Sequence, residues 1–231
     1  MRIIKLWSLC VALVERMARN PGEKPGHALR SRSKFFLSIA GLLSIFASTT
    51  AEATPEEFVI DPAHTYATFE VRHLGISTQR GRFNHTSGRT TFDTDAGTGK
   101  IEIIIDARTI DTGNESMEKL LRGDDFFNVE KFPDINFRST SVSFKDGKPD
   151  KIEGELTLLG TTKPIALAVL NYNCTRLPFL VRVTCGMDAL TTIRRSEFGM
   201  TSLLSFVSDE VKLLIQAEAI RQEPPRPIPT E

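Results

Sequence analysis

The segment Lys100–Arg108, KIEIIIDAR, alternates between two kinds of side chain along its length. Ile101, Ile103 and Ile105 fall on one side of an extended chain, and their neighbours, which include two acidic residues, fall on the other. Because successive side chains of a strand point to opposite faces, this period of two predicts a β-strand with one apolar face. An apolar face must be covered, so the segment predicts a protein built from sheets.

The same period recurs along most of the chain. In Thr65–His73, TYATFEVRH, it places Ala67, Phe69 and Val71 on one face. Turns are expected at Ser87-Gly88, Asp146-Gly147, Gly160-Thr161 and Leu177-Pro178, where turn-forming residues interrupt the pattern. We predict eight strands, at residues 65–73, 81–93, 100–108, 134–144, 150–159, 163–173, 179–193 and 205–220. Eight antiparallel strands with one apolar face either stack as two sheets or close into a barrel.

A single helix is predicted between the third and fourth strands. Thr112-x-x-Glu115 is typical of a capping box, and an apolar i, i+3, i+4 pattern follows at Met117, Leu120 and Leu121. Gly123 suits the position just after the helix.

The N-terminal part of the chain has the pattern of a secretory signal. RSRSK (residues 30–34) is basic, FFLSIAGLLSIFA (residues 35–47) is apolar, and Ala51-Glu52-Ala53 is typical of a cleavage site. Thirteen apolar residues are fewer than the roughly twenty that a spanning helix needs. We therefore expect a leader over residues 1–53, a barrel domain over 54–222 and a proline-rich tail over 223–231. Translation from Met17 and an uncleaved anchor remain alternatives.

Charge argues against nucleic acid as a partner. Residues 1–53 hold 8 of the 29 basic and 3 of the 29 acidic residues, which leaves 21 basic and 26 acidic residues and a formal net charge of −5 in the remainder. Binding to nucleic acid depends on Lys and Arg that neutralise phosphates.

Two cysteines, Cys174 and Cys185, lie outside the leader. In an exported domain two cysteines usually pair, and the intervening TRLPFLVRVT could turn back to bring them together. Two buried, unpaired thiols are the alternative.

Candidate catalytic and metal-binding residues form no recognised pattern. Asp124 and Asp125 are neighbours whose side chains diverge, with no histidine or cysteine nearby in sequence. The histidines at 64, 73 and 85, with Asp61, match no common zinc spacing. No nucleophile elbow, P-loop or dinucleotide fingerprint is present. We assign no catalytic residue and expect neither a metal centre nor a resident cofactor.

From about Phe58 to Arg221 the sequence resembles the YceI-like family of exported, polyisoprenoid-binding proteins with a lipocalin-like barrel. The block LLRGDDFFNVEKFPDINFRS, residues 120–139, is the most specific part of the resemblance. The matching motifs are, in order, Asp61-Pro62-x-His64, Phe69-x-Val71-x-His73, Gly81-x-Phe83 with Gly88, IDARTIDTGN from Ile105, Leu121-Arg122, Asp125-Phe126-Phe127, Glu130-Lys131-Phe132-Pro133, Gly154-x-Leu156-Thr157, Gly160-x-Thr162-Lys163-Pro164 and Ile193–Gly199.

This chain departs from the family pattern at a few positions. Leu120 replaces a common histidine, Gly123 a usual serine and Asn128 a usual aspartate, and the cysteine pair is an addition. These changes put in doubt any polar role of the loop around residues 120–128.

The resemblance implies an all-β, extended eight-stranded antiparallel barrel with one short helix, which holds a quinone tail or a polyprenyl chain in its interior. The expected pocket residues, chosen as apolar on inward faces together with one histidine, are Phe69, Val71, His73, Phe83, Ile103, Ile105, Phe126, Phe127, Phe137, Leu156, Leu158, Leu167 and Val169. We expect a non-enzymatic periplasmic carrier or sequestering protein, with a membrane-bound donor or acceptor and a homodimer as further partners. An enzyme or redox partner acting on such a lipid, and a ligand-free stress-protective barrel, are the alternatives.

Overall fold

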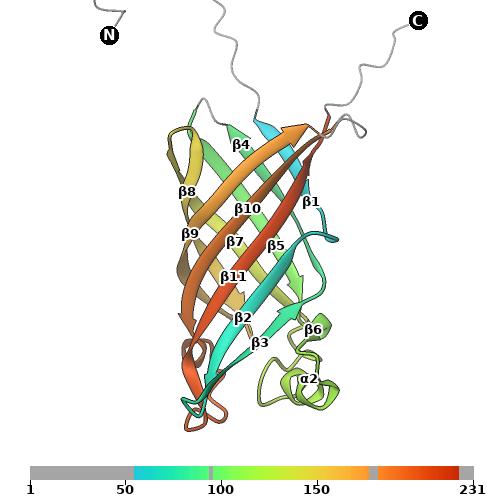
Figure 1. The fold of residues 1–231 in the computed structure, drawn as a ribbon, viewed down its shortest axis with the longest axis vertical. Coiled ribbons are helices and arrows are strands. Elements are labelled where there is room, and N and C mark those ends of the chain that lie inside the picture. The colour runs from blue at the N-terminus through green and yellow to red at the C-terminus, as the bar shows by residue number, and fades with distance from the viewer. Residues whose placement is uncertain (1–54, 94–95, 177–181, 224–231) are drawn as a thin grey trace, which may run out of the picture. The chain divides into compact units, whose positions relative to one another are not determined.

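Eleven strands form one continuous antiparallel sheet in the computed structural model, which describes residues 55–93, 96–176 and 182–223. Figure 1 shows their arrangement. The strands are β1 (Glu56–Ile60), β2 (Tyr66–His73), β3 (Ser77–Phe83), β4 (Thr86–Asp93), β5 (Thr98–Asp106), β6 (Ile110–Asp111), β7 (Asp134–Lys145), β8 (Lys148–Leu158), β9 (Thr161–Arg176), β10 (Val183–Arg194) and β11 (Val207–Arg221). The helices are α2 (Glu115–Arg122) and two short 3₁₀ turns, η2 (Ala107–Thr109) and η3 (Arg195–Phe198).

The sheet closes on itself because β1 pairs with both β4 and β11. The closed ring runs β1-β4-β5-β7-β8-β9-β10-β11 and returns to β1. The remaining strands continue members of the ring: β2 follows β1 after residues 61–65, β3 leads into β4 across residues 84–85, and β6 follows β5 after η2. The predicted eight-stranded antiparallel barrel with one α-helix is therefore confirmed, with three of its strands interrupted. The predicted leader, and the predicted tail beyond Glu223, lie outside the described residues.

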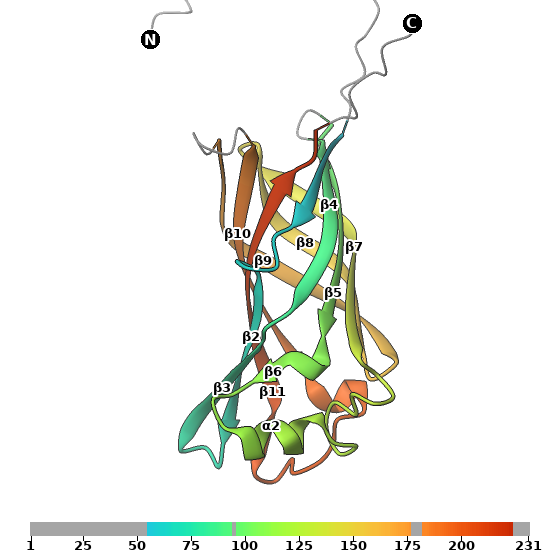
Figure 2. The same ribbon diagram turned by 90° about the vertical axis from the view of Figure 1, so that its right-hand side faces the viewer.

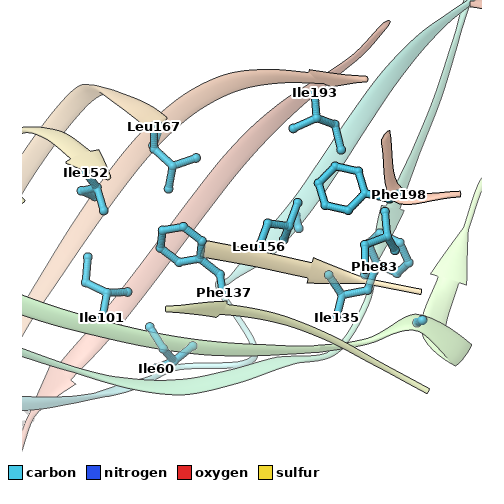
Figure 3. Packing of buried hydrophobic residues seen from close by; sticks show 14 of the residues in the cluster. Ile60, Phe83, Ile101, Ile135, Phe137, Ile152, Leu156, Leu167, Ile193 and Phe198 are labelled. Atoms are coloured by element: carbon cyan, nitrogen blue, oxygen red, sulfur yellow. The ribbon is translucent and has the colours of Figure 1, made fainter. Parts of the chain in front are cut away.

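The apolar alternation of the strands builds the core of the barrel. In β8, Ile152, Leu156 and Leu158 are buried, whereas the charged residues between them are exposed. In β5, Ile101 is buried and Ile104, on the other face, is 45% exposed. Figure 3 shows side chains from facing walls that point toward one another across the interior.

The predicted turn at Asp146-Gly147 is confirmed as a tight hairpin, and the turn predicted at Gly160-Thr161 lies one residue earlier, at Leu159-Gly160. Asp146 and Gly147 have φ angles of 51° and 74°, and Leu159 and Gly160 have φ angles of 52° and 73°. Two successive positive φ angles match the right-handed twist of the strands that the turn joins. The predicted Leu177-Pro178 turn lies outside the described residues.

The predicted turn at Ser87-Gly88 is wrong. Both residues lie within β4, and the interruption falls earlier, at residues 84–85. Gly88 has a φ of 152°, and a Cβ atom there would collide with the backbone of β5 at Glu102 and Ile103. The glycine therefore permits a close approach of two strands instead of a reversal of the chain.

Aromatic rings lie over glycines inside the barrel. Phe69 of β2 is paired with Gly81 of β3, and Phe92 of β4 is paired with Gly99 of β5. A Cβ atom at either glycine would overlap the ring opposite. The small residues thus make room for large apolar side chains on the inner surface.

Cys174 and Cys185 form a disulfide, as predicted. They are directly paired across β9 and β10, with Cα atoms 4.0 Å apart. The two cysteines are 11 positions apart in the sequence, and a disulfide that closes so short a loop contributes about 2–3 kcal/mol to stability in the chain-entropy model.

Helix α2 begins two residues later than the predicted capping box implies. The side chain of Asn114 accepts a hydrogen bond from the Met117 amide at 3.1 Å, so Asn114 is the N-cap in place of Thr112. Glu118 reaches back to the Thr112 amide at 3.0 Å. Gly123 ends the helix with an extended backbone instead of the left-handed conformation typical of a glycine cap.

Candidate functional site

The barrel encloses an apolar cavity of about 210 Å³. Every strand of the closed ring contributes to its lining, which extends from Phe58, Phe92 and Tyr172 at one end to Phe127 and Met200 at the other. Because the volume is small and the lining residues are distributed along so many strands, the cavity is long and narrow. Figure 3 shows part of its wall, with Phe137 and Leu156 directed inward.

Most of the predicted pocket residues line this cavity. Eleven of the thirteen do so: Phe69, Val71, Phe83, Ile103, Ile105, Phe126, Phe127, Phe137, Leu156, Leu158 and Leu167. The isoleucines of β5 lie on the predicted face, since Ile101, Ile103 and Ile105 line the cavity and Ile104 does not. The structure thus brings together residues from six strands and one loop. Whether they bind a ligand stays a prediction.

Two predicted residues lie outside the lining of the described cavity. His73 is the last residue of β2, and the contribution of that strand ends at Val71. Val169 packs against the core beside a bulge in β9, where the pairing with β10 shifts between Asp188 and Ala189. The bulge changes which residues face inward, so Tyr172 lines the cavity further along.

The loop after α2 places two phenylalanines at the helical end of the cavity. Phe126 is buried, and the ring of Phe127 packs edge-on against Phe83 with centroids 5.4 Å apart. Backbone hydrogen bonds from Phe126 and Asn128 to the Gly123 carbonyl hold the loop. Asp124 and Asp125 of the same loop are exposed to solvent. The phenylalanines face the interior, while the aspartates remain hydrated.

Several lining residues were absent from the sequence prediction. Apolar members come from β1, β7 and β11, where an alternation of period two was available as a signal, for example at Ile60, Ile135 and Leu213. Thr86 and Thr90 of β4 were hidden by the mistaken turn at Ser87-Gly88.

Arg195 is the one charged residue that lines the cavity among the described residues. It is 3% exposed, and its guanidinium donates hydrogen bonds of 2.8–3.0 Å to four backbone carbonyls. The acceptors are Met200, Ser202, Val207 and Ser208. Burial lowers the pKa of Arg195, yet an arginine remains protonated at physiological pH. The side chain therefore fastens the segment between η3 and β11 to the barrel.

One cluster has the residue types of a metal site. Asp61, His64 and Glu218 place one potential ligand atom each within 4.8 Å of one another. His64 Nδ1 lies 2.8 Å from a carboxylate oxygen of Asp61, which lowers the pKa of Asp61 and raises that of His64. Asp61 also accepts from the amide of Ala63. These bonds shape the bend between β1 and β2.

Aromatic rings from β4 and β9 line the far end of the cavity. Tyr172 packs edge-on against Phe92 with ring centroids 6.1 Å apart, and its hydroxyl lies 3.2 Å from Sγ of Cys174. Burial raises the pKa of the Tyr172 phenol, so the side chain stays neutral.

Among the described residues, the α2, η2 and η3 helices lack the length and hydrophobicity needed to cross a membrane.

An eight-stranded antiparallel barrel around an apolar cavity defines a binding barrel of the lipocalin-like type. The sequence profile of the YceI-like domain matches residues 58–219, and the chain belongs to this family. A UPF0312 protein of Pectobacterium carotovorum is 34% identical over 191 residues, which cover 82% of this chain and 98% of that protein.

Solved structures have the same fold. The YceI protein of Campylobacter jejuni is 28% identical, with a TM-score of 0.57 over 66% of this chain and 90% of that one. A polyisoprenoid-binding domain from Saccharophagus degradans is 16% identical, with a TM-score of 0.54 over 71% of this chain and 98% of that one.

We predict that Arg195→Leu destabilises the protein by more than about 3 kcal/mol, because four backbone carbonyls lose a charged donor. Urea unfolding followed by circular dichroism measures this change. Arg194→Leu, which removes an exposed guanidinium paired with Asp209, is the matched control and should cost less than about 1 kcal/mol. Equal losses from the two variants would contradict the anchoring role of Arg195.

Proposed function

We propose that the protein is a non-enzymatic periplasmic carrier, or sequestering protein, for an isoprenoid lipid such as a quinone tail or a polyprenyl chain. The observation that carries the proposal is the long apolar cavity inside the closed barrel. An isoprenoid tail is a linear series of methyl-branched apolar units, and its shape suits a narrow cavity. Each buried methylene-sized group contributes about 0.8 kcal/mol, so affinity needs few polar contacts.

The relatives support the same ligand class. The family includes binding barrels, and the Saccharophagus degradans domain is described as polyisoprenoid-binding. The alternative of an enzyme would require titratable groups that converge on a bound substrate. Within the described residues, the charged contribution to the cavity lining is Arg195, which is engaged by backbone carbonyls. We therefore favour binding over catalysis, with the lipid as ligand and no resident cofactor.

Export to the periplasm accords with two features of the chain. Residues 30–53 have the order of a signal peptide, with basic, apolar and small-residue parts. The Cys174–Cys185 disulfide is typical of an oxidising compartment. The formal net charge of −5 after the leader accords with a partner other than nucleic acid.

A membrane is the proposed donor or acceptor of the lipid. Of the large apolar residues exposed among the described ones, most lie at the end of the barrel that carries α2. They are Leu74, Ile76, Met117, Leu120, Leu203, Leu204 and Phe206. Figure 2 shows the β2–β3 hairpin, α2 and the connection from β10 to β11 at this end.

Two segments of this apolar end contain no charged residue: Leu74–Gln79 and Met200–Val207. The Leu74 amide donates to the Phe206 carbonyl, so the segments lie side by side. Val207 lines the cavity next to exposed Phe206, and Leu121 lines it next to exposed Leu120. At this end apolar residues thus lie both on the cavity wall and on the exposed surface, which suits the transfer of a lipid from a bilayer.

We predict that Ile103→Glu lowers the amount of isoprenoid that co-purifies with the protein by at least about tenfold, because it places a carboxylate in the apolar interior. Organic extraction and mass spectrometry measure the lipid, and circular dichroism establishes that the variant is folded. Ile104→Glu is the control, since Ile104 faces outward and is 45% exposed. It should retain both the fold and the lipid.

The outcome that contradicts this prediction is a folded Ile103→Glu protein that keeps its lipid while Ile104→Glu loses it. A wild-type protein that co-purifies with no apolar ligand and binds none when it is added would contradict the carrier function itself.

We predict that Phe206→Ser slows the transfer of a prenylquinone from phospholipid vesicles to the protein by roughly tenfold, because it removes an exposed aromatic side chain from the apolar end. Leu170→Ser is the control, since Leu170 is 64% exposed but lies on β9, outside that end. Equal rates for the two variants would contradict transfer through this end. If Phe206→Ser instead converted a dimer to a monomer, the apolar end would be an interface with a second copy.

A further inference from the structure

Two buried hydroxyl groups on β4 face the apolar cavity. Thr86 is 2% exposed and Thr90 is 7% exposed, and both residues line the cavity. The Oγ1 atom of each has no hydrogen-bond partner among the described residues. Because the two positions are four residues apart in a strand, both side chains project from the same face.

A third buried threonine shows how the fold satisfies such a group elsewhere. Thr65 is 2% exposed and also lines the cavity. Its hydroxyl donates to the Glu218 carbonyl at 3.2 Å and accepts from the Glu218 amide at 3.1 Å. Thr65 therefore joins the connection between β1 and β2 to β11, a role that Thr86 and Thr90 do not have.

Folding alone does not account for threonine at positions 86 and 90. A buried hydroxyl without a partner destabilises the folded state, whereas valine has nearly the same shape and carries no such cost. Buried polar groups are nearly always hydrogen-bonded in native proteins. A hydrogen-bond partner supplied by a bound ligand explains why threonine is present at both positions.

We propose that the wall formed by Thr86 and Thr90 binds the polar head group of the lipid inside the barrel, and that this head group is neutral and bears oxygen, as in a prenylated quinone or phenol. This inference rests on the proposed function and specifies the ligand further. The hydroxyls can donate to a carbonyl oxygen and accept from a phenolic hydroxyl.

The charge of the lining separates a neutral head group from a phosphate. Arg195, the one charged lining residue in the part of the chain that the structure describes, already donates to four carbonyls. A phosphate inside the barrel would bury its negative charge without a cation dedicated to it, which is strongly unfavourable. A quinone or phenol needs only hydrogen bonds.

The spacing of the hydroxyls makes them two separate contact points. Residues four apart in a strand are separated by about 13 Å. The two oxygens of one quinone ring are too close together to reach both hydroxyls at once, so a head group contacts one hydroxyl in a given position.

The test compares a short-chain ubiquinone with squalene, an isoprenoid hydrocarbon without a head group. Both are delivered from cyclodextrin to the wild-type protein and to Thr86→Val, Thr90→Val and the double variant. Bound lipid is measured by extraction and mass spectrometry. We expect each hydroxyl that contacts the head group to contribute roughly 3- to 10-fold to ubiquinone affinity, with squalene binding unchanged. Thermal unfolding should show variants at least as stable as wild type.

Thr91→Val is the matched control, because Thr91 belongs to β4 but does not line the cavity. It should leave both affinities unchanged.

A ratio of ubiquinone affinity to squalene affinity that stays the same in all variants would overturn the inference, and so would an equal loss of both lipids. Tighter binding of a polyprenyl phosphate than of the ubiquinone would also overturn it. In each of these cases the lipid carrier would stand, whereas a wild-type protein that binds none of these lipids would refute the carrier function and, with it, this inference.

Discussion

The pairing of β11 with two successive strands is the interaction on which the barrel depends. One end of β11 pairs with β1, from Phe58 opposite Arg221 to Ile60 opposite Ala219, and the rest pairs with β2. Without both pairings the sheet would have two open edges and the apolar face would lie in water. Closure converts that face into the lining of a cavity.

β11 changes its pairing partner from β2 to β1 near Glu218, and hydrogen bonds to the backbone of Glu218 fix this point. The Asp61 amide donates to the Glu218 carbonyl, and the buried hydroxyl of Thr65 bonds to both backbone groups of the same residue. Asp61 in turn holds His64 and the Ala63 amide, which stabilises the bend that follows β1. The motif that opens the family resemblance therefore has a structural role at the closure of the barrel. Closure and the apolar cavity are consequences of the same few contacts.

The structure could be predicted from the sequence where one periodic pattern of apolar residues extends over a long segment. Alternation of period two identified the inward face of β5 and most pocket residues, because a strand that is exposed on one side must follow it. Val169 continues the inward alternation of β9 and packs against the core, but the bulge that follows it shifts the alternation, so Tyr172 could not be identified. Bulges leave little trace in a single sequence. The prediction failed at Gly88 because a glycine suits a turn and a close strand contact equally well.

Polar residues of the interior were the hardest to predict. Arg195 follows another arginine in the sequence, and the surrounding backbone carbonyls explain why it is buried. Thr86 and Thr90 look like ordinary strand residues until the cavity is known. In contrast, the disulfide could be predicted because only two cysteines remain after the leader. The apolar walls of the site could thus be predicted from the local sequence pattern, whereas its polar features depend on tertiary contacts.

The central claim is that an isoprenoid occupies the interior of the barrel. The most direct test is an NMR experiment on protein with ¹³C-labelled isoleucine methyl groups, saturated with a prenylquinone, in which intermolecular nuclear Overhauser effects are measured. The account predicts contacts from the prenyl methyls to the cavity-lining Ile101, Ile103 and Ile193, and none to Ile104. Contacts confined to the exposed Ile76 and Ile104 would place the lipid on the outer surface and contradict the account.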